Sequence, residues 1–532
     1  MVAYPMLTLL LAFAHGAEPD LLYFVLVDRF ADGRAEGEVH PQDPQGWHGG
    51  DLQGVLDHLD QIPGSGLWLS PIQQARTEPV GEWGAFHGYW TTDLHQLEPR
   101  LATDAELKQL GSTLKADGKE LWLDLVTNHV GYDAAIIEQH PDWFHGLGDI
   151  ENWGDPVESV THDVHGLPDL AQENDEVYAW LLAGATKWVT LAQPTGFRID
   201  AVKHVPEGFL ARLGDDLRKV DPELQLLGEV FEGDTYALAA RQRVDRLDRV
   251  FDFPLHYALK DAVCGGDVGR LAGVIALDAV YDDPSSLVGF LDNHDVARIR
   301  SVCGDDLDAV ARSLALLLTL RGTPCLTWGT ESGLAGAEEP ANRADMVFEP
   351  QPLRPALDAL LALRGAHPAL GRTAVTKVGR VESELVVLGR QGKGQQAVLV
   401  LTGAEGTRWV LPEGAEAWVV SGVEGPVEVE GDLVLGPHQV GIAVSADLGI
   451  GDWFEAEPPA RTVHLEVPTG SVLVGASERL GRWDPAKGVA SVEGFVSLTV
   501  PRGEVLEYKI VGKKADGSWA WPDTGNAVMR VP

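Results

Sequence analysis

The chain has 532 residues, of which 45% are hydrophobic, and a formal net charge of −39 at pH 7. This length is ample for several domains and a large core. The strong acidity argues against nucleic acid and against an anionic membrane surface as partners, whereas a neutral ligand would be indifferent to it.

The N-terminus contains an apolar run, Met6–Ala14, that ends in small residues. Such a run resembles a secretory signal peptide, although no Lys or Arg precedes it, and the alternative is a short N-terminus that is disordered or packed on the core. We expect residues 1–17 to be a signal peptide and the mature protein to be secreted. No other run approaches the roughly 20 residues that span a bilayer, so we expect no membrane contact.

Eight short apolar runs recur along the first two thirds of the chain, and helical patterns separate several of them. This alternation predicts a parallel sheet, and eight repeats fit a (β/α)₈ TIM barrel, in which catalytic groups lie at the carboxyl ends of the strands. The expected strands are 21–27, 66–70, 121–126, 196–200, 226–230, 249–253, 287–291 and 324–328, and the clearest helices are 103–116, 176–191, 209–220, 307–320 and 352–364.

The barrel is expected to occupy residues 18–130 and 171–370. Residues 131–170 lack periodicity and are rich in Trp, His, Gly, Asp and Pro, which predicts a small inserted domain after the third strand. Alternating patterns with Gly and Glu turns predict an all-β domain over 371–448, a linker over 449–460 and a second β module over 461–532.

Charged residues gather where the predicted strands end. In Gly196–His204, Arg198 and Asp200 alternate with apolar residues, so both lie on one side of the strand, where a buried pair costs less than either charge alone. A structural ion pair would explain that motif by itself. However, Asp124 and Glu229 also lie toward the ends of predicted strands, and the segment 292–295 follows another. Because such ends meet at one mouth of a barrel, we favour a functional site.

Four motifs in order carry a resemblance: Asp124–Val130, Gly196–His204, Gly228–Val230 and Phe290–Asp295. With them, residues 20 to 450 resemble the α-amylase family of glycoside hydrolases, family 13. Retaining hydrolysis of a glycosidic bond needs a nucleophilic carboxylate and a carboxylic acid.

The resemblance implies that Asp200 is the nucleophile, that Glu229 is the acid/base, and that Asp295 holds sugar hydroxyls and favours the distorted transition state. Arg198 would keep Asp200 ionised, and the surroundings of Glu229 should raise its pKa.

The resemblance also implies a set of substrate-binding residues around these acids. Tyr89 would stack on the sugar at the bond that is cleaved, and Lys203 and His204 would reach the sugar on the far side of that bond. A Lys at a helix start, however, is often only solvated. The full set is Arg198, His129, His294, His87, Tyr89, Trp90, Lys203, His204 and Arg343, the last from a loop after the eighth strand.

Calcium is the cofactor that the resemblance implies. Calcium takes several oxygen ligands, and the matching positions are Asn128, Asp169 and the backbone oxygen of His204. The cysteines offer no competing metal site, because Cys264, Cys303 and Cys325 lack zinc spacing and permit at most one disulfide.

The final module resembles the starch-binding domains appended to amylases and glucoamylases. Trp483 and Trp521 would stack on consecutive glucose units while Lys509 and Asn526 bond their hydroxyls. The alternative is that both tryptophans are core residues of a β-sandwich.

We therefore expect a secreted, monomeric, calcium-dependent enzyme that cleaves internal α-1,4 bonds of starch, glycogen or maltooligosaccharides with retention. A cyclodextrin-forming or other α-1,4-glucan transglycosylase is the alternative within the same chemistry. A catalytically inactive glucan-binding protein is the alternative of another class, although intact Asp200, Glu229 and Asp295 speak against it.

Overall fold

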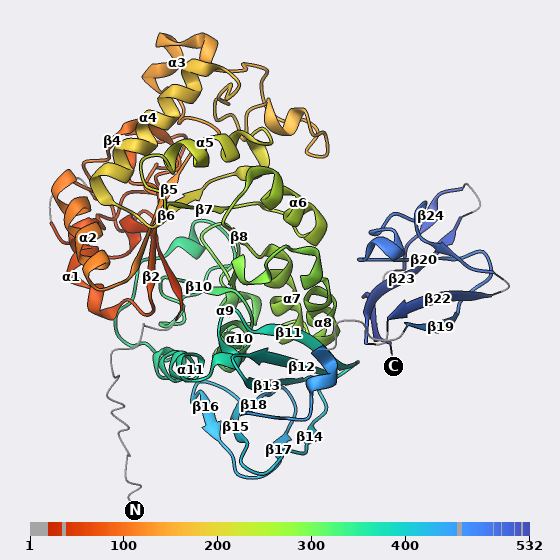
Figure 1. Ribbon diagram of the computed structural model, residues 1–532. Helices are drawn as coiled ribbons and strands as arrows, with labels where there is room; N and C mark the ends of the chain where they lie inside the picture. Colours follow the sequence, from red (N-terminus) through yellow and green to blue (C-terminus); the bar gives the residue numbers. More distant parts are fainter. Residues whose placement is uncertain are drawn as a thin grey trace, which may run out of the picture.

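The computed structural model describes residues 20–34, 39–454, 460–492, 494–501, 503–514, 517–522 and 525–531. The expected signal peptide, residues 1–17, lies outside these ranges. The described chain forms a barrel, a β domain beside it and a second β module at the C-terminal end (Figure 1).

Eight parallel strands close into a barrel in the order β1-β10-β9-β8-β7-β6-β5-β2. Nearly all their residues are buried, as expected for strands covered on both faces, and this burial explains their continuous apolar sequences. The TIM barrel and its eight strands are confirmed. The strands are β1 Leu22–Val25, β2 Gly66–Leu69, β5 Glu120–Leu125, β6 Gly196–Ile199, β7 Gln225–Gly228, β8 Arg249–Phe251, β9 Leu287–Phe290 and β10 Thr323–Thr327.

Helices surround the barrel, and several start at a residue whose side chain accepts a hydrogen bond from the first turn. Thr103, for example, forms a capping box with Glu106 at the start of α2. The helices are α1 Leu52–Asp57, α2 Asp104–Ala116, α4 Asp175–Ala192, α5 Phe209–Leu217, α6 Thr235–Asp245, α7 Phe253–Val263, α8 Val268–Ala276, α9 Ile299–Val302, α10 Leu307–Thr319 and α11 Arg354–Ala366. Among the described residues, none of these helices has the length and apolar character to cross a bilayer.

A disulfide between Cys264 and Cys303 joins the ends of α7 and α9. It is the single bridge that three cysteines permit. Cys325, on β10, is buried and free.

The chain leaves the barrel after β5 and returns at α4. The excursion contains α3 Ala135–Gln139 and the short turns η3 Pro141–Trp143 and η4 Glu158–Val160. Isolated bridges pair His129 with Asp169 and Phe144 with Leu170, so the two ends of the excursion lie together. The smaller hairpin of β3 Gln73–Ala75 and β4 Thr91–Leu97 precedes it.

The β domain after the barrel has a six-stranded sheet, β11-β12-β13-β18-β15-β16, and a two-stranded sheet, β14-β17. Their bounds are β11 Val375–Glu382, β12 Leu385–Gly392, β13 Gln395–Thr402, β14 Thr407–Trp409, β15 Glu416–Val420, β16 Pro426–Glu428, β17 Leu433–Leu435 and β18 Val440–Ser445.

The predicted linker, 449–460, includes a structured segment at residues 451–454. These residues form the short helix η10 Gly451–Phe454. The ring of Trp453 covers Gly379 and Gly389 so closely that a Cβ on them would lie 2.1 Å and 2.6 Å from ring atoms. This packing holds the segment on the β domain, and residues 455–459 lie outside the described ranges.

The C-terminal module consists of two small sheets around an apolar core. One sheet pairs β19 Ala460–Glu466 with β22 Phe495–Pro501, and the other is built on β20 and β23. Leu473, Val496 and Leu506 are among the buried residues between them. The remaining strands are β20 Val472–Gly475, β21 Val489–Ala490, β23 Val505–Lys513, β24 Trp519–Ala520 and β25 Ala527–Arg530.

Candidate active site

Arg198 is completely buried at the mouth of the barrel and contacts three carboxylates. Its Nη1 donates to Oδ1 of Asp200 at 2.7 Å and to Oδ1 of Asp124 at 3.0 Å, and its Nη2 lies 2.5 Å from Oε1 of Glu229. The acids come from β5 and from the ends of β6 and β7, which are paired in that order. The structure therefore brings the two predicted catalytic acids together around one cation.

The turn after β6 fixes Glu229. Ala201 has a left-handed backbone, with φ of 48°, which is unusual for a residue other than glycine. This turn directs the N–H of Ala201 at Oε2 of Glu229, at 3.1 Å, and the N–H of Val202 donates to the Glu229 carbonyl at 3.0 Å. Glu229 is thus held by its backbone and its side chain.

The electrostatics assign a proton to Glu229. Burial raises its pKa to about 8, because the opposing effect of Arg198 is offset by the negative charges of Asp200 and Asp295. Burial likewise raises the pKa of Asp124 to about 7, against the effect of Arg198. The raised pKa of Glu229 is in the expected direction. With one cation serving three acids, protonation of Glu229 reduces the excess of negative charge.

Aromatic and histidine rings form a wall beside the acids. The Tyr89 ring stacks on His294, with centroids 4.9 Å apart, and its hydroxyl donates to Asp124 at 2.8 Å. Burial lowers the pKa values of His87, His129 and His294, the last to about 3, so these imidazoles are neutral at pH 7. Neutral rings can hydrogen-bond a sugar without adding charge.

Trp90, which was predicted to bind substrate, is half-buried, and its ring packs edge-on against His87, with centroids 4.9 Å apart. Its other contact is the ring of Tyr132, at the start of the excursion after β5.

Asp295 is held by Arg343 on the opposite side of the mouth. Arg343 Nη2 lies 3.2 Å from Oδ1 of Asp295 and 2.6 Å from Oε1 of Glu339, and its Nε donates to the carbonyl of His294. Burial alone would raise the pKa of Asp295, but His294 and Arg343 lower it below the ordinary value. Asp295 is therefore ionised at neutral pH, unlike Glu229.

Lys203 and His204 lie on the short helix η5 Val202–His204, after Asp200. The Lys203 ammonium is 3.4 Å from Oε2 of Glu232. The His204 ring donates from Nδ1 to the carbonyl of Ser159 at 2.9 Å and packs edge-on against Trp153. His204 therefore connects the barrel to the excursion after β5.

Two exposed aromatic rings beside the site were not predicted. Trp153 is 51% exposed, and Phe231, two residues after Glu229, is 43% exposed. The sequence could have indicated Phe231, because it lies two residues after Glu229. The position of Trp153 near the site depends on the fold and could not be read from the sequence.

The predicted calcium ligands carry unpaired oxygens. Oδ1 of Asn128 and Oδ1 of Asp169 are both buried and have no hydrogen-bond partner. Oδ2 of Asp169 lies 2.5 Å from Nδ1 of His145, a residue that was not predicted. Burial raises the pKa of Asp169 to about 7. Two unpaired oxygens of this kind fit a hard cation such as calcium.

No cluster of three or more His, Cys, Asp or Glu side chains that could hold a metal ion occurs in the described part of the chain. The proposed ligand set is not of that kind, because it includes an amide oxygen from Asn128 and a backbone oxygen from His204.

The residues predicted to bind starch have different surroundings in the described part of the module. Trp483 is half-buried against a cluster of three valines, where the unpredicted Trp519 also packs. Trp521 is 44% exposed, and Lys509 Nζ lies 3.4 Å from the carbonyl of Pro522.

Asn526 lies at the border with the barrel. Its side chain donates to Oε1 of Glu507 at 2.5 Å, and it lines a pocket with Asp267, from the turn before α8. Its amide is thus already engaged by the protein.

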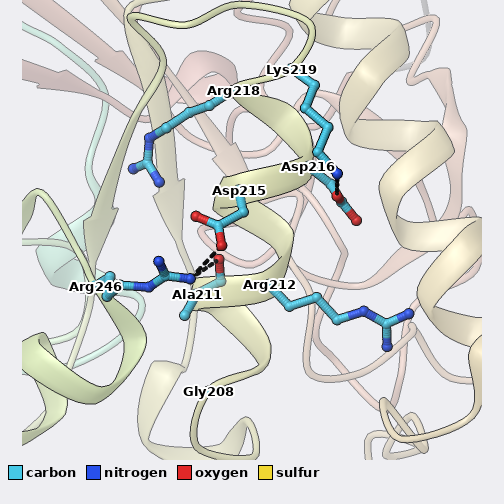
Figure 2. A pocket seen from close by; sticks show the side chains of 8 residues that line it. All are labelled: Gly208, Ala211, Arg212, Asp215, Asp216, Arg218, Lys219 and Arg246. Carbon is cyan, nitrogen blue, oxygen red and sulfur yellow. Dashed lines mark hydrogen bonds and ion pairs between the residues drawn. The ribbon is translucent and has the colours of Figure 1, made fainter.

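A separate pocket of about 660 Å³ lies on the outer face of α5 (Figure 2). Its cations are paired with carboxylates, for example Arg246 with Asp215 and Lys219 with Asp216, both at 2.5 Å. It contains none of the predicted site residues. The lining residues are Gly208, Ala211, Arg212, Asp215, Asp216, Arg218, Lys219 and Arg246.

A closed (β/α)₈ barrel with paired carboxylates at its mouth defines a class of protein, the barrel glycoside hydrolases. The family model for the alpha amylase catalytic domain matches residues 24–356, and the chain belongs to this family.

Beta/alpha-amylase of Paenibacillus polymyxa is 30% identical over 417 residues, which cover 71% of this chain and 33% of that protein. Maltogenic alpha-amylase of Bacillus acidopullulyticus is 28% identical over 385 residues, covering 65% and 62%. The chain thus spans less than two thirds of the length of both relatives. The crystal structure of an Anoxybacillus alpha-amylase superposes with a TM-score of 0.73 at 30% identity, covering 80% of this chain and 97% of that one.

Proposed function

We propose that this protein is an endo-acting, retaining hydrolase of internal α-1,4 bonds in starch and related glucans. The observation that carries the proposal is the arrangement around Arg198, which contacts both Asp200 and Glu229. Because one guanidinium touches both acids, their carboxyl groups lie close together, as retention requires.

In the proposed reaction, Asp200 attacks the anomeric carbon while Glu229 protonates the departing glycosidic oxygen. A covalent glycosyl-enzyme forms, and Glu229, now ionised, takes a proton from the water that hydrolyses it. The raised pKa of Glu229 supplies the acid form for the first step. Asp295 would hold sugar hydroxyls, and Tyr89 would stack on the sugar.

The names of the relatives support an α-glucan substrate, since they are amylases, and starch, glycogen or maltooligosaccharides are the substrates we propose. One of them is maltogenic. A transglycosylase that forms cyclodextrins uses the same acids, so product analysis must separate the two activities.

We propose calcium as a structural cofactor. Asn128 and Asp169 would supply side-chain oxygens, and His204 its backbone oxygen. When bound, the ion would offset the buried charge of Asp169 and tie the excursion after β5 to the barrel. The two unpaired oxygens support this proposal.

We also propose that the C-terminal module binds starch through Trp483 and Trp521 and that the protein is a secreted monomer. The disulfide between Cys264 and Cys303 supports an oxidising compartment.

The test is the product profile from soluble starch with calcium present, followed over time by chromatography and a reducing-end assay. Linear oligosaccharides with rising reducing ends are expected, and their newly released anomer should be α. Dominant cyclic products would favour the transglycosylase. Absence of turnover together with sedimentation on starch granules would favour an inactive glucan-binding protein.

A further inference from the structure

The C-terminal module contacts the barrel and the β domain after it through two separate zones. In the first zone, β23 and β25 contact α8, and β25 also contacts β11. Glu507 packs so closely on Gly273 that a Cβ there would lie 2.7 Å from its Oε2, and Arg530 Nε donates to the carbonyl of Val378 at 2.8 Å. This zone fixes one side of the module.

The second zone joins the turn that carries Trp483 to the start of α6. Arg482 Nη2 lies 2.7 Å from Oδ1 of Asp234, and its guanidinium lies over the Tyr236 ring, 4.6 Å from the centroid. The Tyr236 hydroxyl accepts a hydrogen bond of 3.1 Å from the N–H of Glu478. We call Arg482, Asp234 and Tyr236 the clasp. Because the two zones involve separate segments of the chain, together they restrain the module more than either zone alone.

The clasp leads toward the active site. Asp234 caps α6 by accepting from Ala237 N at 2.8 Å, and its own N–H donates to Oε1 of Glu232 at 3.0 Å. The other oxygen of Glu232 faces Lys203. A polar path therefore runs from Arg482 through Asp234 and Glu232 to Lys203. The same loop, residues 230–234, carries the exposed ring of Phe231.

We infer that Arg482 and Tyr236 are positioning residues. Through them the C-terminal module holds loop 230–234 in place, and this loop forms the side of the active site that binds the leaving group. The inference rests on the proposed function for the identity of the substrate. Glu229 itself is fixed by the turn after β6. Loss of the clasp should therefore disturb binding on the Lys203 side more than proton transfer.

The test compares full-length Arg482→Ala with Arg479→Ala. Both arginines lie near the same turn, and their side chains are 41% and 45% exposed, but Arg479 contacts Thr499 and Glu504 within the module. Because Arg482→Ala removes both the ion pair with Asp234 and the cation–π contact with Tyr236, we expect it to raise KM for maltoheptaose about fivefold. Its kcat should change by less than about twofold. Arg479→Ala should match the wild type, and Arg482→Lys should recover part of the loss.

Hydrogen exchange of residues 230–240 supplies a readout that needs no activity. Faster exchange in Arg482→Ala, but not in Arg479→Ala, supports the clasp. Wild-type exchange in Arg482→Ala overturns it, and faster exchange with an unchanged KM overturns the positioning role. If the wild type itself does not turn over maltoheptaose, the proposed function fails, while the exchange data still decide whether the module holds the loop.

Discussion

The proton on Glu229 links activity to stability, and Glu229→Gln separates the two. Burial raises the pKa of Glu229 from 4.5 to about 8, so between these values the folded protein keeps a proton that the unfolded chain releases. The free energy of unfolding of the wild type therefore falls as pH rises through this window. Gln has no proton to release, so its free energy of unfolding does not fall in this way. Relative to the wild type, the free energy of unfolding of Glu229→Gln therefore rises by roughly 2 to 3 kcal/mol between pH 5 and pH 7.

Urea unfolding at pH 5, 6 and 7, followed by tryptophan fluorescence, measures this difference. Glu223→Gln, the same substitution at an exposed position, is the control. Loss of the general acid should also lower kcat about 10²-fold to 10⁴-fold. Parallel stability curves for Glu229→Gln and the wild type would refute the raised pKa, and near-normal kcat would refute the role as acid.

Three further variants test the rest of the site. Asp200→Asn should abolish most release of reducing sugar while leaving adsorption to granular starch unchanged; substantial turnover would exclude it as nucleophile. Arg198→Ala should lower the free energy of unfolding by about 3 to 5 kcal/mol, because it leaves buried carboxylates without a cation; an unchanged urea midpoint would contradict this. Asn128→Ala should remove the rise in Tm that calcium gives the wild type, and an equal rise in both would place the ion elsewhere.

The barrel was predictable because strands buried on both faces carry continuous apolar residues, and the acids were predictable because they follow those strands. The contact of Arg198 with several carboxylates was only partly predictable from the sequence. Its pairing with Asp200 follows from strand alternation, whereas its contact with Asp124 depends on the register between β5 and β6.

What could not be predicted depends on contacts between distant segments. Trp453 looked like part of a linker because its partners, Gly379 and Gly389, lie more than sixty residues earlier in the chain. The amide of Asn526 meets Glu507, 19 residues earlier, at the border with the barrel, a contact that the sequence does not indicate. The exposure of Trp153 likewise depends on how residues 131–170 fold.

The disulfide has a consequence for the chemistry of handling this protein. Cys325 is enclosed in the barrel and burial raises the pKa of its thiol, which suppresses exchange of Cys325 with the Cys264–Cys303 disulfide in the folded state. The closed loop spans 39 residues and is worth about 4 kcal/mol by loop entropy. It contains α8, the helix on which the C-terminal module rests. Mild reducing agents would therefore loosen that support without creating mispaired isomers.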